Sequence, residues 1–369
     1  MKVVFRADAS LQIGSGHVMR CLTLACALRE KGTECHFICR EHPGHLLNLI
    51  RDKGFTAYGL SINEPSAVSE LRDAYATQPA HASWLGATQT QDAESCAAIL
   101  ETVKPDWLIV DHYALDVKWE NLLRKFFNRL LVIDDLADRK HECDLLLDQN
   151  LGHTDAHYAG LVTPRCELLV GPKYALLRPE FSHLREKSIA RRDLSRIQHI
   201  LITMGGVDQN NATGATLRAL RTCLLSDDCT ITVVMGLKAP CLDDVVEVAA
   251  GMQWPTEVLS NVTDMGERMA TADLVIGAAG STSWERCCLG VPTIMVVLAD
   301  NQISGARALQ QSGSVVMIEH ASEIPVQLPL ALESLSHGDA LQTMSESARK
   351  ISDGLGIQRV VKKMGFNNV

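Results

Sequence analysis

Short apolar runs alternate with amphipathic stretches along most of the chain. Short apolar runs bounded by turn residues are typical of strands buried on both faces, and the stretches between them have helical spacing. We expect strands in the first part of the chain at residues 2–5, 34–39, 56–60, 107–111, 130–134 and 145–148. Regular alternation of strand and helix predicts right-handed crossovers and a doubly wound parallel sheet.

A second alternating series begins near residue 197. Its expected strands are residues 197–203, 229–236, 257–259, 274–276 and 290–298, with helices at 211–220, 243–250, 304–312 and 341–352. Proline dipeptides and a charged run separate the two series, and 369 residues suit two domains better than one. We therefore expect an N-terminal domain at 1–165, a connection at 166–196 and a C-terminal domain at 197–369.

The composition is that of a globular protein, with 46% hydrophobic and 21% charged residues. The 35 basic and 44 acidic residues give a net charge of −9, which argues against nucleic acid or an anionic membrane as a partner. No apolar stretch reaches membrane-spanning length, and the chain starts without a long apolar segment, so we expect a cytoplasmic protein. The 12 cysteines include no Cys-x-x-Cys pair and are expected to be core residues.

A glycine-rich turn follows the first expected strand. Gly14 and Gly16 allow positive φ and close approach of a ligand, and the following helix would offer free N–H groups to an anion. His17 stands at the start of that helix, where the positive end of the helix dipole disfavours its protonated form. A neutral imidazole is then available as a base. The alternative is a histidine that only hydrogen-bonds the turn.

Several polar residues follow the carboxyl ends of the expected strands. Ligands of doubly wound sheets lie beyond these ends, so Asp8, His17, residues 111–113, residues 134–135 and Asn150 are candidates for one site. Each of them could instead be a cap or turn residue. Their common position at one rim favours a binding site.

The second series contains two more loops suited to phosphate. Gly205 and Gly206 follow the strand at 197–203. A turn of small residues at 277–283 precedes a helix that contains Glu285, which can accept two hydrogen bonds from ribose hydroxyls. Ser281 or Thr282 can cap this helix. The turn lacks the Gly-x-Ser-x-Gly pattern of a serine hydrolase.

Four segments carry a resemblance to a known family. They are Arg-Ala-Asp-x-Ser with Ile-Gly-x-Gly-His-Val-Met-Arg within 6–25, Val-Asp-His-Tyr within 110–116, Met-Gly-Gly-Val-Asp at 204–208 and Gly-Ala-Ala-Gly-Ser-Thr-Ser-Trp-Glu at 277–285. Together they resemble the UDP-2,4-diacetamido-2,4,6-trideoxy-β-L-altropyranose hydrolases of pseudaminic acid biosynthesis, which are nucleotide-sugar enzymes of GT-B architecture. Residues 63–90 offer nothing to match.

The resemblance implies a GT-B fold, with two Rossmann-like parallel-sheet domains facing across a cleft. It implies that water displaces UDP from a UDP-linked trideoxy sugar, with inversion at the anomeric carbon and without a metal or cofactor. His17 falls on the family's catalytic histidine. The substrate-binding positions expected from motif and resemblance are Gly14, Gly16, Asp111, Tyr113, Gly205, Gly206, Ser281, Thr282, Glu285 and Asn301. Diphosphate is a competent leaving group, so a single base suffices and the paired carboxylates of most glycosidases are not needed.

Two other functions remain open. A glycosyltransferase of the same fold would use His17 to deprotonate an acceptor hydroxyl, and a module that only binds nucleotide sugars would leave its ligand unchanged. The expected partner in each case is a small UDP-sugar, and we expect a monomer.

Overall fold

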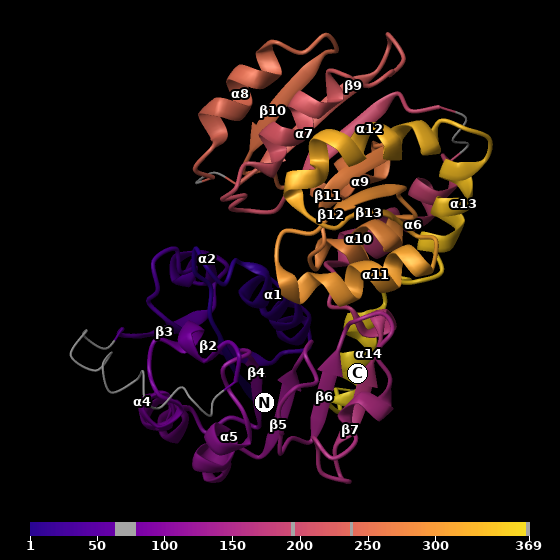
Figure 1. Cartoon of the computed structure of the whole chain (residues 1–369). Coiled ribbons are helices and arrows are strands. Elements are labelled where there is room, and N and C mark those ends of the chain that lie inside the picture. Colours follow the sequence, from indigo (N-terminus) through magenta and orange to yellow (C-terminus); the bar gives the residue numbers. More distant parts are fainter. Residues whose placement is uncertain (63–78, 193–195, 237–238, 367–369) are drawn as a thin grey trace. The chain divides into compact units, whose positions relative to one another are not determined.

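The computed structural model describes residues 1–62, 79–192, 196–236 and 239–366. The chain forms two compact units (Figure 1). The first consists of Met1–Leu176 with Gly356–Val369, and the second of Leu177–Leu355. In the described ranges, every helix is too short or too polar to cross a bilayer.

The first unit is built on a parallel sheet in the order β3-β2-β1-β4-β5-β6-β7. All of its neighbouring strands run in the same direction; Val3, for example, pairs with Cys35 on one side and Trp107 on the other. The strands are β1 (Lys2–Ala7), β2 (Glu34–Arg40), β3 (Thr56–Leu60), β4 (Trp107–Asp111), β5 (Arg129–Ile133), β6 (Leu145–Asp148) and β7 (Glu167–Val170).

Helices cover both faces of this sheet. Alternate strand residues such as Phe5 and Ile109 pack against α1 (Gly16–Glu30), α2 (Leu47–Asp52) and α14 (Gly356–Lys363). The residues between them pack against α4 (Gln89–Val103) and α5 (Val117–Leu123). The 3₁₀ helices of the unit are η3 (Ala82–Leu85), η4 (Arg124–Phe126), η5 (Asp155–Tyr158) and η6 (Pro172–Tyr174).

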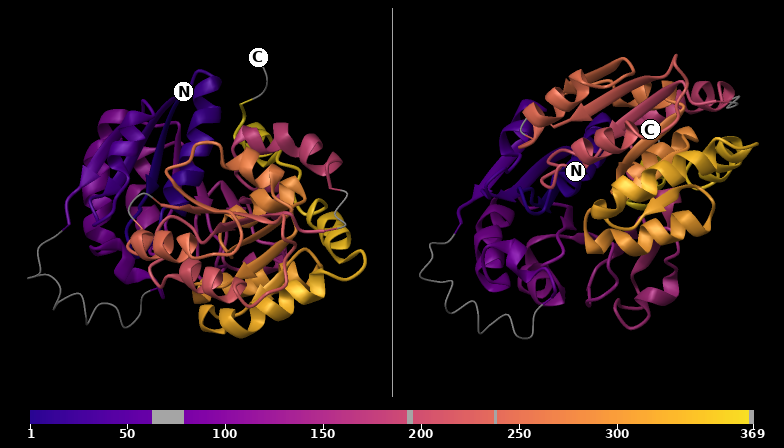
Figure 2. Two further views of the ribbon diagram at one scale, coloured as in Figure 1. Left: turned by 90° about the horizontal axis from the view of Figure 1, so that it is seen from above. Right: turned by 45° about the horizontal axis from the view of Figure 1, so that its top comes forward.

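The second unit repeats this design around a parallel sheet in the order β10-β9-β8-β11-β12-β13. Its strands are β8 (His199–Thr203), β9 (Thr230–Met235), β10 (Thr256–Ser260), β11 (Leu274–Ala278), β12 (Thr293–Val296) and β13 (Val316–Ile318). Its helices are α6 (Pro179–Ala190), α7 (Ala212–Leu220), α8 (Leu242–Ala250), α9 (Met265–Thr271), α10 (Thr282–Leu289), α11 (Ile303–Gln311), α12 (Ile324–Leu335) and α13 (Ala340–Ala348), with 3₁₀ helices η7 (Asp300–Gln302) and η8 (Ala321–Glu323). Figure 2 shows the sheet and helices of each unit from two further directions.

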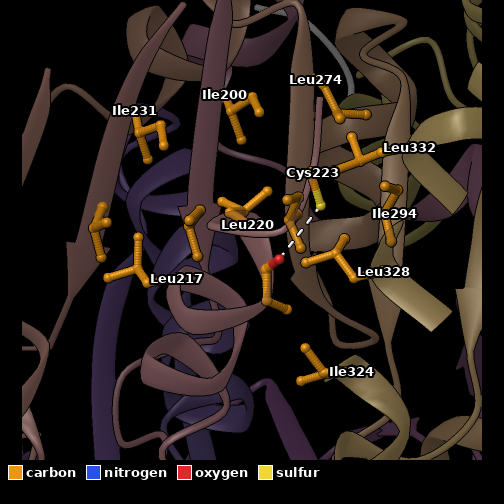
Figure 3. Close-up of a cluster of buried hydrophobic side chains, with 14 of the residues drawn as sticks. Ile200, Leu217, Leu220, Cys223, Ile231, Leu274, Ile294, Ile324, Leu328 and Leu332 are labelled. Carbon is orange, nitrogen blue, oxygen red and sulfur yellow. Dashed lines mark hydrogen bonds between the residues drawn. The ribbon is translucent and has the colours of Figure 1, made fainter. Parts of the chain in front are cut away.

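The core of the second unit lies between its sheet and the helices α7, α8 and α12. Ile200 and Leu274 from neighbouring strands meet Leu217 of α7 and Leu328 of α12 (Figure 3). The Cys223 thiol lies in the same layer and donates to the carbonyl of Ala219. Ile200 and Leu274 face this layer because every second residue of a strand points to one side of the sheet, and the other side chains are buried because they pack on that side.

In both sheets the strand order reverses beside the first strand of the unit. The reversal lies between β1 and β4 in the first unit and between β8 and β11 in the second. In open parallel sheets, the loops at the carboxyl ends of these strands diverge and leave room for a ligand. The expected phosphate loops follow β1, β8 and β11, and Asp8 and Asp111 stand at the ends of β1 and β4, whereas residues 134–135 and Asn150 follow β5 and β6.

Two segments lie elsewhere than the sequence pattern indicated. Residues 166–196, expected as a connection, contain β7, which pairs with β6, and α6, which belongs to the second unit. The C-terminal helix α14, expected within a domain at 197–369, places Ile357 and Val360 in the core of the first unit. Its apolar face fits the surface left open beside α1, which a linear reading of strand and helix order does not reveal.

Candidate active site

The loop between β1 and α1 is a tight turn stabilised by Ser10. Its hydroxyl accepts the N–H groups of Gln12 and Ile13, and its carbonyl accepts the N–H of Gly14. Gly14 has a φ of 81°, which favours glycine at this position. The residue before α1, Ser15, makes no side-chain capping bond, so its hydroxyl leaves the first helical N–H groups uncapped.

His17 is paired with a buried carboxylate at the end of β4. Its Nδ1 lies 2.5 Å from Oδ1 of Asp111, and the histidine is 8% exposed. When Nδ1 carries the proton, the carboxylate fixes that tautomer and leaves a lone pair on Nε2. Nε2 has no hydrogen-bond partner among the described residues. The ring is therefore oriented by Asp111 rather than by the glycine turn, which was the alternative reading of this histidine.

Arg20 holds Asp111 and Asp135 together. Its Nε and Nη2 lie 2.6 and 2.7 Å from the two oxygens of Asp111, and its Nη1 lies 2.6 Å from Asp135. Burial acts to raise the pKa of Asp111, but Arg20 and His17 together lower it well below its usual range. Asp111 is thus an anion at any working pH. Arg20 is the last residue of the Ile-Gly-x-Gly-His-Val-Met-Arg motif, but its position in the sequence did not predict a role for it.

Tyr113 closes the same cluster. Its hydroxyl donates to Asp135 at 2.8 Å, and its ring meets the His17 ring edge-on with centroids 4.6 Å apart. Burial and the neighbouring Asp135 raise the pKa of Tyr113 well above its usual range, so it remains a neutral phenol. His81, just before η3, and Trp84 within it lie beside this ring, with centroids 5.5 and 5.9 Å from it. These two residues fall in the stretch that offered no sequence signal.

Other acidic residues at the same rim have structural partners. Asp8 is fully buried and pairs with Arg6, and its second oxygen lies 3.2 Å from His112. Asp134 pairs with Arg139 at 2.9 Å. The Asn150 amide donates to the carbonyl of Asp135. Of the rim residues expected from sequence, Asp8, Asp134 and Asn150 therefore each bond to other residues of the first unit.

In the second unit, the loop after β8 presents a glycine backbone. Gly205 has a φ of 91°, and a Cβ at this position would meet nothing within 4 Å. Asp208 accepts the N–H groups of Ala212 and Thr213 at the start of α7. Because Asp208 already uses these helical N–H groups, the groups left for a phosphate at this loop belong to the backbone around Gly205 and Gly206.

The turn after β11 leads into α10 without a side-chain cap. Ser281 occupies the capping position but makes no side-chain capping bond, contrary to the expectation for Ser281 or Thr282. Both residues reach the surface, Ser281 fully and Thr282 in part. The N–H groups of Ser283 and Trp284 donate to the carbonyls of Gly280 and Ser281, so the N–H groups left for an anion are those of residues 280–282.

Glu285 lies one turn into α10 and is largely buried. Its side chain is 14% exposed, and its Oε1 lies 3.7 Å from Arg178. Burial raises the pKa of Glu285 to about 7, against the opposing effect of Arg178 and Arg286. Asn301 on η7 is exposed, and no hydrogen bond of its side chain is found in the described part of the chain.

The expected site residues thus form two sets, one in each unit. Gly14, Gly16, His17, Asp111 and Tyr113 surround the ends of β1 and β4. In the second unit, the candidates around the ends of β8 and β11 are Gly205, Gly206, Ser281, Thr282 and Glu285. Asn301 lies apart from them in sequence, on η7 after β12. All twelve cysteines are free thiols, and the described residues include no cluster of ligands that could hold a metal ion.

The chain is similar to known proteins in sequence and in fold. The glycosyltransferase family 28 C-terminal domain matches residues 225–360. An uncharacterised protein of Methanocaldococcus jannaschii is 24% identical over 308 residues, 82% of this chain and 56% of that protein. The UDP-2,4-diacetamido-2,4,6-trideoxy-β-L-altropyranose hydrolase of Campylobacter jejuni is 29% identical over 214 residues, 57% of this chain and 62% of the hydrolase. The chain therefore aligns with little more than half the length of these curated relatives.

The crystal structure of Acinetobacter baumannii MurG matches the chain with a TM-score of 0.71 and 18% identity, covering 99% of each chain. Two doubly wound parallel sheets and this likeness identify the fold as GT-B. The expectation of two Rossmann-like domains is confirmed.

Proposed function

We propose that this chain is a nucleotide-sugar enzyme that hydrolyses UDP-2,4-diacetamido-2,4,6-trideoxy-β-L-altropyranose. The observation that carries the proposal is the pair of His17 and Asp111, in which an imidazole is oriented by an anion and keeps Nε2 without a partner. A site that only binds nucleotide sugars gains little from such a base. The 29% identity to the Campylobacter jejuni hydrolase supports the choice of substrate.

In the proposed reaction, Nε2 of His17 accepts a proton from a water molecule as the water oxygen bonds to the anomeric carbon. The bond between that carbon and the diphosphate oxygen breaks, and UDP leaves with the bonding electrons. Attack opposite the leaving group inverts the anomeric configuration. The imidazolium that forms is stabilised by the Asp111 carboxylate 2.5 Å from Nδ1.

The second unit has the chemistry to bind the nucleotide. The glycine backbone at 205–206 and the N–H groups of residues 280–282 would hold the diphosphate, and Glu285 would accept hydrogen bonds from the ribose. Tyr113 is proposed to contact the sugar because its ring lies against His17. Asn301 is proposed as a further substrate contact on the basis of the family resemblance alone.

Glycosyl transfer is the second candidate, favoured by the match of residues 225–360 to a glycosyltransferase domain. The same imidazole would then deprotonate an acceptor hydroxyl instead of water. The two reactions differ in whether products form when no acceptor is present.

Proton NMR of the full chain mixed with this UDP-sugar in EDTA, without an acceptor, tests the proposal. We expect UDP and free sugar, with the inverted anomer appearing first. Intact substrate that is consumed only after an acceptor is added would establish transfer instead. Intact substrate under both conditions would reject both reactions with this donor.

The His17→Ala variant is the matching control for the base. We expect turnover to fall by about a hundredfold or more, as for the loss of a general base, while UDP affinity changes less than about twofold. A variant that keeps a near-normal rate would exclude His17 as the base.

A further inference from the structure

Arg286 is a buried cation beneath the turn that precedes α10. It is 1% exposed, and its Nη2 donates to the carbonyl of Ala278 at 2.8 Å and to the hydroxyl of Ser283 at 3.0 Å. Its Nε and Nη1 are buried and have no hydrogen-bond partner in the described part of the chain. Sequence spacing gave this arginine no role, since an arginine next to Glu285 on a helix is normally a solvated residue.

The positive charge of Arg286 has little compensation in the ligand-free protein. Among the described residues, no carboxylate lies within ion-pair distance of its guanidinium. The neighbouring Glu285 has its pKa raised to about 7 by burial and is only partly ionised at neutral pH. Burial lowers the pKa of Arg286 to about 10, so it nevertheless remains protonated. A buried charge without a counter-ion is costly, and such groups are usually retained for a reason.

The guanidinium lies where the strand order of the second unit reverses. A Cβ on Gly277 would stand 2.4 Å from Nη1 of Arg286 and 2.8 Å from the carbonyl oxygen of Thr203. Gly277 and Thr203 pair near the ends of β11 and β8. Glycine at 277 therefore leaves the space that the cation occupies, directly below the turn at 278–282.

We propose that Arg286 supplies the positive charge that binds the diphosphate of the nucleotide at this turn. The charge acts through the low-dielectric interior, and the bonds to Ala278 and Ser283 hold the turn and the first turn of α10 in the shape that receives the anion. Arg286 is thus a positioning and electrostatic residue rather than a contact. This inference rests on the proposed function, in which the second unit binds a nucleoside diphosphate.

Arg192 offers a matched control within the same unit. It is also buried, at 7% exposed, and its Nε also has no hydrogen-bond partner among the residues that the structure describes. Its guanidinium donates to the carbonyls of Ala272, Met269 and Ala270, which lie before β11 and so at the opposite end of that strand. A loss of buried charge at Arg192 should therefore affect stability but not the binding of an anion.

The test compares binding of UDP, inorganic pyrophosphate and uridine to the full chain by calorimetry. Arg286→Met removes charge and hydrogen bonds, Arg286→Gln keeps a neutral donor, and Arg286→Lys keeps a charge. At pH 8, where Glu285 is mostly a carboxylate, we expect Arg286→Met and Arg286→Gln to weaken the binding of UDP and pyrophosphate about tenfold or more and to change uridine affinity less than about twofold. Arg286→Lys should have an intermediate effect on UDP and pyrophosphate. Arg192→Met should bind all three as the unmodified chain does.

Equal loss of UDP and uridine affinity, or no loss of either, would overturn the role of Arg286. Should both neutral variants unfold, ¹⁵N NMR of the arginine side chains in the unmodified chain decides. A buried guanidinium signal, identified by its absence in Arg286→Lys, should shift with UDP or pyrophosphate but not with uridine, and an unshifted signal would reject the inference. If the unmodified chain itself fails to bind UDP, the proposed function falls instead.

Discussion

At the scale of single residues, the orientation of His17 depends on the charge of Asp111. Asparagine at 111 can present its NH₂ group to Nδ1, which would favour the tautomer with the proton on Nε2, and it also weakens the bonds to Arg20. We predict that Asp111→Asn lowers kcat about a hundredfold or more with little change in KM. Steady-state kinetics with the UDP-sugar measure both constants.

Asp92→Asn is the control for this variant. Asp92 is equally buried and accepts hydrogen bonds from Arg6 and Arg40, but it makes no contact with His17. It should reduce thermal stability without a comparable loss of kcat in the protein that remains folded. Equal kinetic losses in the two variants would mean that Asp111 acts only through stability.

The raised pKa of Glu285 makes nucleoside binding depend on pH. Only the carboxylate form accepts two hydrogen bonds from the ribose, and burial raises the pKa of this group to about 7. We predict that uridine affinity increases as pH rises from 6 to 8, and that Glu285→Gln makes it weak and independent of pH. A series of calorimetric titrations over this range measures the effect; a pH-independent affinity in the unmodified chain would remove Glu285 from the ribose.

The same shift has the opposite effect on the stability of the ligand-free protein. The unfolded chain loses the Glu285 proton near pH 4.5 and the folded chain only near 7, so this group lowers stability as pH rises between these values. The difference corresponds to about 3 kcal/mol at most. Glu285→Gln should therefore melt at a higher temperature than the unmodified chain at pH 8 and at a similar one near pH 4.5. A lower melting temperature for the variant at pH 8 would contradict this.

At the scale of elements, α14 is the segment whose position the sequence did not reveal. Ile357 is 4% exposed and lies in the core of the first unit. We predict that Ile357→Ala destabilises that unit by about 2–4 kcal/mol, as expected for a truncated core side chain. Hydrogen exchange should show faster opening of α1 and β1 while α7 and β8 remain unchanged.

Leu355→Ala provides the comparison, since Leu355 is 42% exposed and two residues away. It should leave exchange in both units nearly unchanged. If Ile357→Ala loosened the second unit instead, α14 would stabilise that unit and not the first.

The central strands could be predicted from the sequence because they are buried on both faces and appear as unbroken apolar runs. The central strands β4 and β6 have the bounds expected from the pattern, and so does the edge strand β3, which is only partly buried. The strand β7 could not be recognised, because it begins with the exposed Glu167 and only Leu169 of its four residues is fully buried. It becomes a strand by pairing with β6, and the sequence around residues 167–170 contains no sign of this pairing.

The candidate site divides in a similar way. His17 and Asp111 could be predicted to lie at one rim, because parallel strands bring their carboxyl ends together. Arg20 and Arg286 could not, because an arginine on a helix resembles a solvated residue until the tertiary structure shows what surrounds it. Buried charge is a property of the fold and leaves no periodic signal.

At the scale of the whole molecule, the second unit is one continuous segment with its own sheet and core. The side-chain bonds of Arg185 to Cys288, Arg349 and Ser352 all lie within residues 177–355. The first unit, by contrast, needs both ends of the chain. Cutting the chain at the unit boundaries therefore leaves the second unit's described contacts intact.

We predict that a fragment of residues 177–355 folds cooperatively and binds UDP with nearly the affinity of the full chain, but does not hydrolyse the UDP-sugar because it lacks His17. Thermal melting and calorimetry with UDP measure the two properties. A cut after residue 196, the domain boundary expected from the sequence, would instead remove α6 from this unit, and with it Arg185 and Arg192. A fragment of 197–369 should therefore melt less cooperatively than 177–355, and equal behaviour of the two fragments would show that α6 contributes little to the fold.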